Sequence, residues 1–109
     1  MLLDFTLYER RKGDVRARMH TSGKGKIIVS ALSPHSSIGL HTHTTSDDIS
    51  YVFSGRGKAV CDGSEETLES GCCHICPKGS EHSIENTGDE DLVLFTVECE
   101  REDGKDREN

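Results

Sequence analysis

The segment Gly71-Cys-Cys-His-Ile-Cys-Pro-Lys-Gly-Ser-Glu-His-Ser-Ile-Glu-Asn86 decides the fold of this chain. Its first part, Cys72–Cys76, favours a β-strand, and the turn signal Pro77-Lys78-Gly79 ends that strand. His82 lies on the extended run that follows the turn. The segment therefore predicts two strands joined by a tight turn, with a histidine on the second strand.

Further β-favouring runs lie on both sides of this segment. They are Lys26–Leu32, Ile49–Phe53, Lys58–Cys61 and Leu92–Glu98. Turn signals separate the runs at intervals of roughly 8 to 12 residues, which is the spacing of a β-sandwich or barrel. No apolar period of about 3.6 residues persists for three turns, so we expect little helix. Residues 4–19 have room for one or two more strands, with an interruption at residues 10–13.

Length and composition predict one small domain with a thin core. The chain has 109 residues, of which 32% are hydrophobic, and it has no tryptophan. We place the domain at residues 1–99, and a bound metal or a second subunit would reinforce its core. Residues 100–109 are mostly charged and lack apolar side chains, so we expect them to form a disordered tail.

Charge and hydropathy exclude several classes of partner. A net charge of −7 disfavours binding to nucleic acid and to anionic membranes. No segment approaches the roughly 18 apolar residues of a membrane span. The first residues lack a basic region followed by an apolar run, so we expect no secretion and a cytoplasmic protein.

The five cysteines, an odd number, indicate free thiols in a reducing compartment. Cys73 and Cys76 have the spacing of a C-x-x-C redox or zinc motif. In a strand, however, residues three apart face opposite sides and lie roughly 10 Å apart, whereas a disulfide needs α-carbons within about 7 Å. We therefore interpret these cysteines as buried or half-buried thiols.

A second polar segment carries His41, His43 and Asp48. The two histidines are two residues apart, so on a strand both imidazoles face the same side. A polar turn at residues 44–47 then leads to Asp48, whose carboxylate is placed to face them from the neighbouring strand. His82 follows much later, and only tertiary folding brings it near. Three imidazoles and a carboxylate are a ligand set for a divalent cation.

In these two segments the chain resembles the cupin family of small double-stranded β-helix, or jelly-roll, barrels. The family's first motif is a histidine pair, a carboxylate and a glycine, which here are His41, His43, Asp48 and Gly55. The second motif has the residues Gly71, Pro77, Gly79, His82 and Asn86, with the family's spacing throughout. The motifs cover residues 39–86, and the flanking strands extend the resemblance to about residues 26–98. The resemblance implies an all-β jelly-roll barrel.

The resemblance also implies a metal bound by His41, His43 and His82, with Asp48 as the fourth ligand. The family usually has Glu where Asp48 stands, and Asp is shorter by one methylene. In metal–oxygen bonds of about 2.0–2.2 Å, that difference decides whether the oxygen reaches the ion. One alternative is that Asp48 bonds nearby backbone amides in a turn. Another is that Asp47 replaces it, although Asp47 should face the opposite side of the strand.

The other polar and inward-facing positions receive structural interpretations. We expect no ligand role for His20, His35 and His74. Asn86 is expected to bond the backbone or to orient a ligand from outside the metal site. Strand parity predicts that the pocket is lined by Ser50, Val52 and Ile84. Without a metal, the histidine triad would simply form polar lining of the barrel.

Imidazole and carboxylate ligands without a thiolate suit Mn²⁺, Fe²⁺, Co²⁺, Ni²⁺ or Zn²⁺, and the resemblance favours Fe²⁺ or Mn²⁺. It implies a metal-dependent enzyme of the dioxygenase, decarboxylase or isomerase type, acting on a small anionic or oxygen-chelating molecule. The alternative is a non-catalytic sensor or storage module on the same barrel. A metal-free sugar-nucleotide epimerase lacks the triad and is discounted. The resemblance also implies a homodimer.

Overall fold

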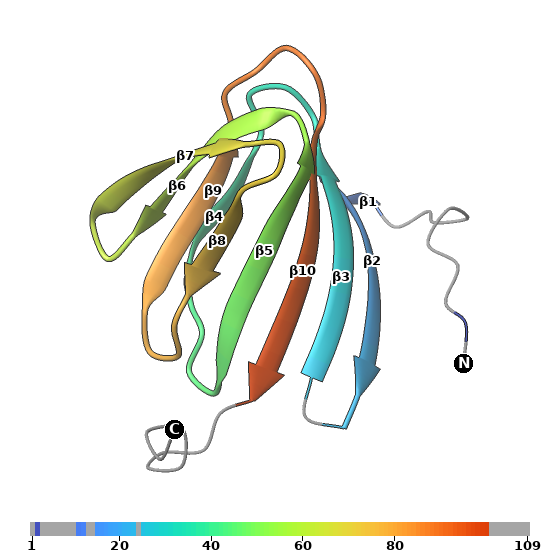
Figure 1. The fold of residues 1–109 in the computed structure, drawn as a ribbon, viewed down its shortest axis with the longest axis vertical. Helices are drawn as coiled ribbons and strands as arrows, with labels where there is room; N and C mark the ends of the chain where they lie inside the picture. The colour runs from blue at the N-terminus through green and yellow to red at the C-terminus, as the bar shows by residue number, and fades with distance from the viewer. Residues whose placement is uncertain (1, 3–10, 13–14, 24, 101–109) are drawn as a thin grey trace.

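Antiparallel strands form all the regular structure in the residues that the computed structural model describes, which are 2, 11–12, 15–23 and 25–100. They lie in two sheets that face each other (Figure 1). The larger sheet has the order β1-β2-β3-β10-β5-β8, with the bounds Arg11–Lys12, Val15–Ser22, Gly25–Leu32, Leu92–Glu100, Ser46–Ser54 and Cys73–Cys76. The smaller sheet has the order β4-β9-β6-β7, with the bounds Ser37–Thr42, Glu81–Asn86, Arg56–Cys61 and Ser64–Glu69. The prediction of an all-β jelly-roll barrel is confirmed.

The strands differ from the expected runs at a few places. β7 does not stand out in the sequence, because Leu68 is its single buried residue and the rest of the strand is exposed. β1 occupies Arg11–Lys12, within the expected N-terminal interruption, and the other residues of 3–14 lie outside the described part of the chain. β10 continues through Glu100, the first residue of the expected tail, and residues 101–109 again lie outside the described part.

The interior changes from apolar to polar along the strands. The inward-facing residues of β5 are Ser46, Asp48, Ser50 and Val52. At one end lies the apolar core, formed by Leu32, Val52, Ala59, Leu68, Ile84, Leu92 and Leu94. Toward the other end Ser50 shares a 2.8 Å hydrogen bond with Thr96, and Asp48 lies opposite Glu98 of β10. The core therefore leaves a polar end, where the candidate site lies.

Two turns expected from the sequence have the backbone geometry that their residues favour. Asp62 and Gly63 have φ of 49° and 85° and join β6 to β7, which fits a type I′ hairpin turn. Gly79 has φ of 90° in the turn before β9, where the Ser80 N–H donates to the Pro77 carbonyl at 3.0 Å. A side chain at Gly79 would therefore strain this turn, which leads directly into β9 and His82.

The cysteines are free, and strand parity separates the C-x-x-C pair as expected. Cys76 is buried on the inner face of β8, but Cys73 is exposed on its outer face, so the interpretation as a buried or half-buried thiol is wrong for Cys73. The described residues contain no helix at all, and so none that could cross a membrane.

Candidate metal centre

Three histidines and one aspartate meet at the polar end of the interior. The ligand atoms of His41, His43, Asp48 and His82 all lie within 4.8 Å of one another. Nε2 of His82 lies 3.0 Å from Nε2 of His41 and 3.1 Å from Nε2 of His43. Oδ2 of Asp48 lies 2.7 Å from Nε2 of His43 and 3.2 Å from Nε2 of His82. The structure thus brings together all four residues that the sequence predicts as ligands.

Backbone pairing explains how the two motif segments meet. His41 on β4 lies directly opposite His82 on β9. His43 follows the end of β4, and its carbonyl accepts a 2.6 Å hydrogen bond from the Gly79 N–H. The His43 N–H donates in turn to the Ser80 carbonyl at 3.4 Å. The turn of the second segment is therefore bonded to the backbone of the first, so that the two segments position each other.

Asp48 approaches the histidines from the opposite sheet. The sequence predicts that the turn at residues 44–47 leads into a neighbouring strand, but β4 and β5 lie in different sheets. This turn carries the chain across the barrel, so the Asp48 carboxylate faces the histidines across the interior. Asp47 is oriented away from the group, as expected from strand parity, and its Oδ1 accepts a 2.8 Å hydrogen bond from the Lys78 N–H.

The hydrogen bonds around the group leave lone pairs directed at its centre. Nδ1 of His41 lies 2.7 Å from the Gly39 carbonyl oxygen. A carbonyl can only accept, so Nδ1 carries the proton and Nε2 of the neutral ring presents a lone pair. Asp48 is only 5% exposed, and its Oδ1 is buried without a hydrogen-bond partner among the described residues. An unpaired buried carboxylate oxygen is costly, and a bound cation would remove that cost.

The spacing of the donor atoms fits a six-coordinate ion. Two ligands that bind at right angles with bonds of about 2.1 Å are separated by about 3 Å. The two Nε2 separations at His82, 3.0 and 3.1 Å, match this value. Four protein ligands on such an ion leave open positions for a substrate or ligand. When bound, the metal would act there as a Lewis acid.

A buried thiol lies next to this group without joining it. Cys76 of β8 is directly opposite Asp48 of β5. Burial raises the pKa of the Cys76 thiol to about 12, and the neighbouring Cys61 thiol adds to the rise. A thiol that stays protonated is a poor metal ligand, because thiolate is the binding form. The donor set therefore consists of nitrogen and oxygen.

His74 lies next to the ligand group although the sequence indicates no role for it there. It is only 1% exposed, and its Nε2 lies 3.0 Å from Nδ1 of His82. Its Nδ1 lies 2.7 Å from Oε1 of Glu66. Strand parity with the buried Cys76 is the signal that would have placed His74 inside the barrel.

The other residues that the sequence singles out contact the backbone or the apolar core, or lie outside the ligand group. Asn86 is fully buried and bonds only backbone: its Nδ2 donates to the carbonyls of Leu32 and Glu90, and its Oδ1 accepts from the Gly88 N–H, all at 2.8 Å. Two of the expected pocket residues face inward but belong to the apolar core, namely Val52 and Ile84. Two of the histidines without an expected ligand role, His20 and His35, lie outside the ligand group.

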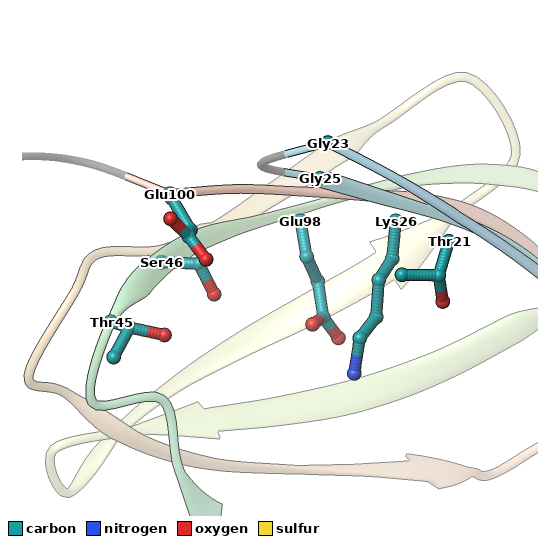
Figure 2. Close-up of a pocket in the computed structure, with 8 residues that line it drawn as sticks. All are labelled: Thr21, Gly23, Gly25, Lys26, Thr45, Ser46, Glu98 and Glu100. Carbon is teal, nitrogen blue, oxygen red and sulfur yellow. The ribbon is translucent and has the colours of Figure 1, made fainter.

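A pocket opens on the inner face of the larger sheet, and its lining includes Lys26, Ser46 and Glu98 (Figure 2). Strand register places Asp48 opposite Glu98, Glu98 opposite Lys26, and Lys26 opposite Thr21. Neighbouring strands are about 4.8 Å apart, so Lys26 lies two strand spacings from Asp48. The Glu98 carboxylate and the Lys26 ammonium group point in the same direction from neighbouring strands (Figure 2). The pocket thus places one cation, that of Lys26, and two carboxyl groups, those of Glu98 and Glu100, near the metal ligands.

Comparison with known proteins places this geometry in a family. The model of the cupin domain matches residues 28–98, which include both motif segments. The chain belongs to the cupin family. A curated relative, the oxalate-binding protein of Thermotoga maritima, is 38% identical over 66 residues, which are 61% of this chain and 54% of that protein. An uncharacterised protein of Methanocaldococcus jannaschii is 36% identical over 56 residues, 51% of this chain and 45% of that protein.

Solved cupin structures have the same architecture. A crystal structure of a predicted oxalate decarboxylase from Thermotoga maritima superposes with a TM-score of 0.85 and 29% identity, covering 93% of this chain and 100% of that chain. The KdgF structure from Halomonas sp. has a TM-score of 0.74 and 16% identity, covers 88% of each chain, and supports the fold alone. The chain spans about half the length of the curated relatives it matches.

Proposed function

We propose that this cupin binds a divalent transition metal through His41, His43, Asp48 and His82, and that the metal holds a small carboxylate chelator of the oxalate class. The observation that carries the proposal is the convergence of three Nε2 atoms and a buried carboxylate within 4.8 Å, where Oδ1 of Asp48 has no hydrogen-bond partner in the part of the chain that the structure describes. The nitrogen and oxygen donor set favours Fe²⁺ or Mn²⁺, with Co²⁺, Ni²⁺ and Zn²⁺ as alternatives.

Two features support a dicarboxylate as the ligand. The relative from Thermotoga maritima is named for oxalate binding, and oxalate chelates a metal through two oxygens at open positions. Lys26, on the same row of inward-facing side chains as Asp48, supplies a positive charge for the oxygens that the metal does not hold. The negative charge of the whole chain would repel such an anion, so this local cation is needed.

The first candidate function is a metal-dependent enzyme, with decarboxylation of oxalate as its reaction class. The supporting observations are the solved structure described as a predicted oxalate decarboxylase and the inward-facing carboxyl group of Glu98 beside Asp48. In this reaction the oxalate monoanion breaks its carbon–carbon bond and yields carbon dioxide and formate. The Glu98 carboxyl group, opposite Asp48 on the neighbouring strand, is the group that we propose to carry the proton of the monoanion to the carbon that becomes formate.

The second candidate is a non-catalytic binding module, which the name of the oxalate-binding relative favours. Turnover separates the two candidates. Metal-loaded protein would be incubated with oxalate, and formate, carbon dioxide and oxygen uptake would be measured. Formate release supports the decarboxylase, oxygen uptake indicates oxidation of oxalate to two carbon dioxide molecules with O₂ reduced to hydrogen peroxide, and saturable binding without consumption supports the binding module.

Metal binding itself is tested by elemental analysis of protein purified without a His-tag or chelators. We expect about one equivalent of metal in the unmodified protein, and less than about one tenth of that in His82→Ala. His20→Ala removes a histidine outside the ligand group and serves as the matched control. The thermal midpoints of the metal-free proteins show whether each variant folds. Full metal content in folded His82→Ala would refute the site.

Anion recognition is tested by calorimetric titration of the metal-loaded protein with oxalate. Removing one charge from Lys26 by substitution to Gln is expected to weaken oxalate binding by about tenfold while leaving the metal content unchanged. Lys58→Gln removes the same charge from the smaller sheet and is the control. Equal oxalate affinity in both variants would remove Lys26 from the proposal.

We also propose an assembly and a compartment for this protein. The outer face of the larger sheet exposes the apolar side chains of Tyr51, Phe53, Ile75 and Phe95, and a second copy of this chain is the partner that we propose for it.

Five free cysteines suit a reducing compartment, so we propose a cytoplasmic location.

A further inference from the structure

A series of side-chain contacts, Glu66 to His74 to His82, leads from the surface to the Nδ1 side of the His82 ring. Glu66 has a side chain 55% exposed, whereas those of His74 and His82 are each 1% exposed. Oε1 of Glu66 lies 2.7 Å from Nδ1 of His74, and Nε2 of His74 lies 3.0 Å from Nδ1 of His82. Nε2 of His82 then faces the other ligands. Each ring therefore has a partner at both of its nitrogens.

The chemistry of the first partner fixes the protons along this series of contacts. A carboxylate accepts hydrogen bonds, so Nδ1 of His74 carries a proton, and in the neutral imidazole Nε2 is then left as an acceptor. That acceptor requires the proton of His82 on Nδ1, which leaves the lone pair on Nε2. Nε2 is the atom of His82 that joins the ligand group, so Glu66 selects the metal-binding tautomer through His74.

Ring geometry is consistent with this direction of donation. The planes of His74 and His82 differ by 16°, and the ring centroids lie 5.2 Å apart. With a contact of 3.0 Å between two ring nitrogens, the rings meet edge to edge, where the N–H bond and the lone pair both lie in the ring plane. The contact therefore also fixes the rotation of the His82 ring.

The series of contacts from Glu66 to His82 joins the edges of the two sheets. Glu66 lies on β7, the edge strand of the smaller sheet, and His74 lies on β8, the edge strand of the larger sheet. Since β7 and β8 are not paired with each other, the Glu66–His74 contact is a side-chain link across this edge of the barrel. His82 on β9 is thus held from both sheets.

We propose that His74 is a positioning residue for metal binding, and that Glu66 orients it, so that the Glu66–His74 pair sets the tautomer and direction of His82. The inference rests on the proposed metal site and adds two residues to it that do not touch the ion. Partners of this kind raise the affinity of a histidine for metal by holding it in the binding orientation.

The test uses Co²⁺, whose visible absorption reports both the affinity and the geometry of the bound ion. His74→Leu removes the acceptor for the His82 Nδ1–H, and we expect Co²⁺ affinity to fall by about 10- to 100-fold. Glu66→Ala removes the carboxylate and is expected to cost about tenfold. His74→Gln keeps an amide oxygen near the position of Nε2, so we expect it to restore affinity to within about threefold.

Glu65→Ala is the matched control, because Glu65 is the outward-facing neighbour of Glu66 and carries the same charge. It is expected to leave Co²⁺ affinity unchanged. A purely structural role of His74 predicts a lower thermal midpoint of the metal-free protein with an unchanged spectrum at saturating Co²⁺. A positioning role predicts an altered spectrum in His74→Leu that returns in His74→Gln.

The outcomes distinguish this inference from the proposed function. If the unmodified protein binds Co²⁺ and folded His74→Leu binds it with the same affinity and spectrum, the positioning role is overturned while the metal site stands. An unchanged saturated spectrum with only a lower midpoint overturns it as well. If the unmodified protein binds no Co²⁺, the proposed function fails, and the inference fails with it.

Discussion

Asp48 combines two properties that rarely occur together at one residue. It is buried beside three imidazoles, and one of its oxygens has no hydrogen-bond partner in the described residues. A turn residue that bonds backbone amides, which the sequence leaves as an alternative, would show such bonds. Asp47 instead accepts a backbone hydrogen bond, from the N–H of Lys78 in the turn before β9. Asp48 occupies the position at which the family usually has Glu. Its carboxylate reaches the histidines because β5 lies in the opposite sheet and faces them across the interior.

Substitution of Asp48 by Asn tests its role as a ligand. The amide keeps the shape and can still accept a hydrogen bond from His43, so we expect the metal-free protein to change its free energy of unfolding by less than about 1 kcal/mol. Metal affinity is expected to fall by at least about tenfold, because the charge of the ligand is lost. Chemical denaturation and metal titration measure the two effects. Unchanged metal affinity would leave the three histidines as the whole site.

Cys76 gives a prediction about pH. The pKa of its thiol is about 12 in the folded protein, against 9.0 for an ordinary thiol. The folded state thus holds this proton more tightly than the unfolded state does. Below about pH 9 the group adds no pH dependence, and the free energy of unfolding falls as pH rises from 9 toward 12. Cys76→Ala should show a shallower loss of stability over this range in urea denaturation at several pH values.

At the scale of the elements, two of the three motif glycines, Gly55 and Gly71, differ in what surrounds them. Gly55 has φ of +91° and lies between β5 and β6, and a Cβ there would overlap the Asp91 carbonyl oxygen and lie 2.9 Å from Cα of Leu92. Gly71 has φ of +95°, but no atom lies within 4 Å of a Cβ built on it. Both glycines satisfy a backbone requirement, and only Gly55 also allows two segments to approach closely.

We expect Gly71→Ala to cost about 1–2 kcal/mol of unfolding free energy, the usual cost of a side chain in a left-handed conformation. Gly55→Ala should cost more, about 3 kcal/mol or above, because the strain and the overlap with backbone add. Equilibrium denaturation in urea measures both. Equal losses in the two variants would show that the β5–β6 turn moves away from Asp91 at little cost.

At the scale of the whole molecule, the larger sheet has two chemically different faces. Its inner face carries the core and the polar row beside Asp48, whereas its outer face exposes aromatic and aliphatic side chains. Among them, Tyr51 and Phe95 are directly opposite each other on β5 and β10. Contiguous apolar surface of this kind on a small chain typically marks an interface. Burial of this face against a second copy would also supplement a small core.

Phe53 is the test of this interface, because its side chain is 67% exposed on the outer face of β5. We expect the unmodified protein to sediment as a dimer at micromolar concentration and Phe53→Asp to sediment as a monomer, since a charge buried without a partner is strongly unfavourable. Thr67→Asp, which introduces the same negative charge on β7 of the smaller sheet, is expected to remain dimeric. An unmodified protein that sediments as a monomer would disprove the assembly.

The sequence by itself determined the fold class and the composition of the candidate ligand group. Turn residues such as Asp62, Gly63 and Gly79 punctuate the strands, and their backbone preferences are local properties that a sequence states directly. The spacing of His41 and His43, joined to that of the second motif, likewise identified residues that the structure brings together. β7 did not stand out, because its exposed polar residues lack the alternation that indicates a half-buried strand.

Tertiary structure alone decided how these residues act on one another. That Asp48 comes from the opposite sheet, that His74 and Glu66 stand behind His82, and that Lys26 shares a row with Asp48 all depend on strand order and register. Pairing between distant strands is fixed by burial and packing of the whole barrel, and no local sequence pattern encodes it. The sequence therefore named the atoms that converge, and only the folded barrel determined their partners.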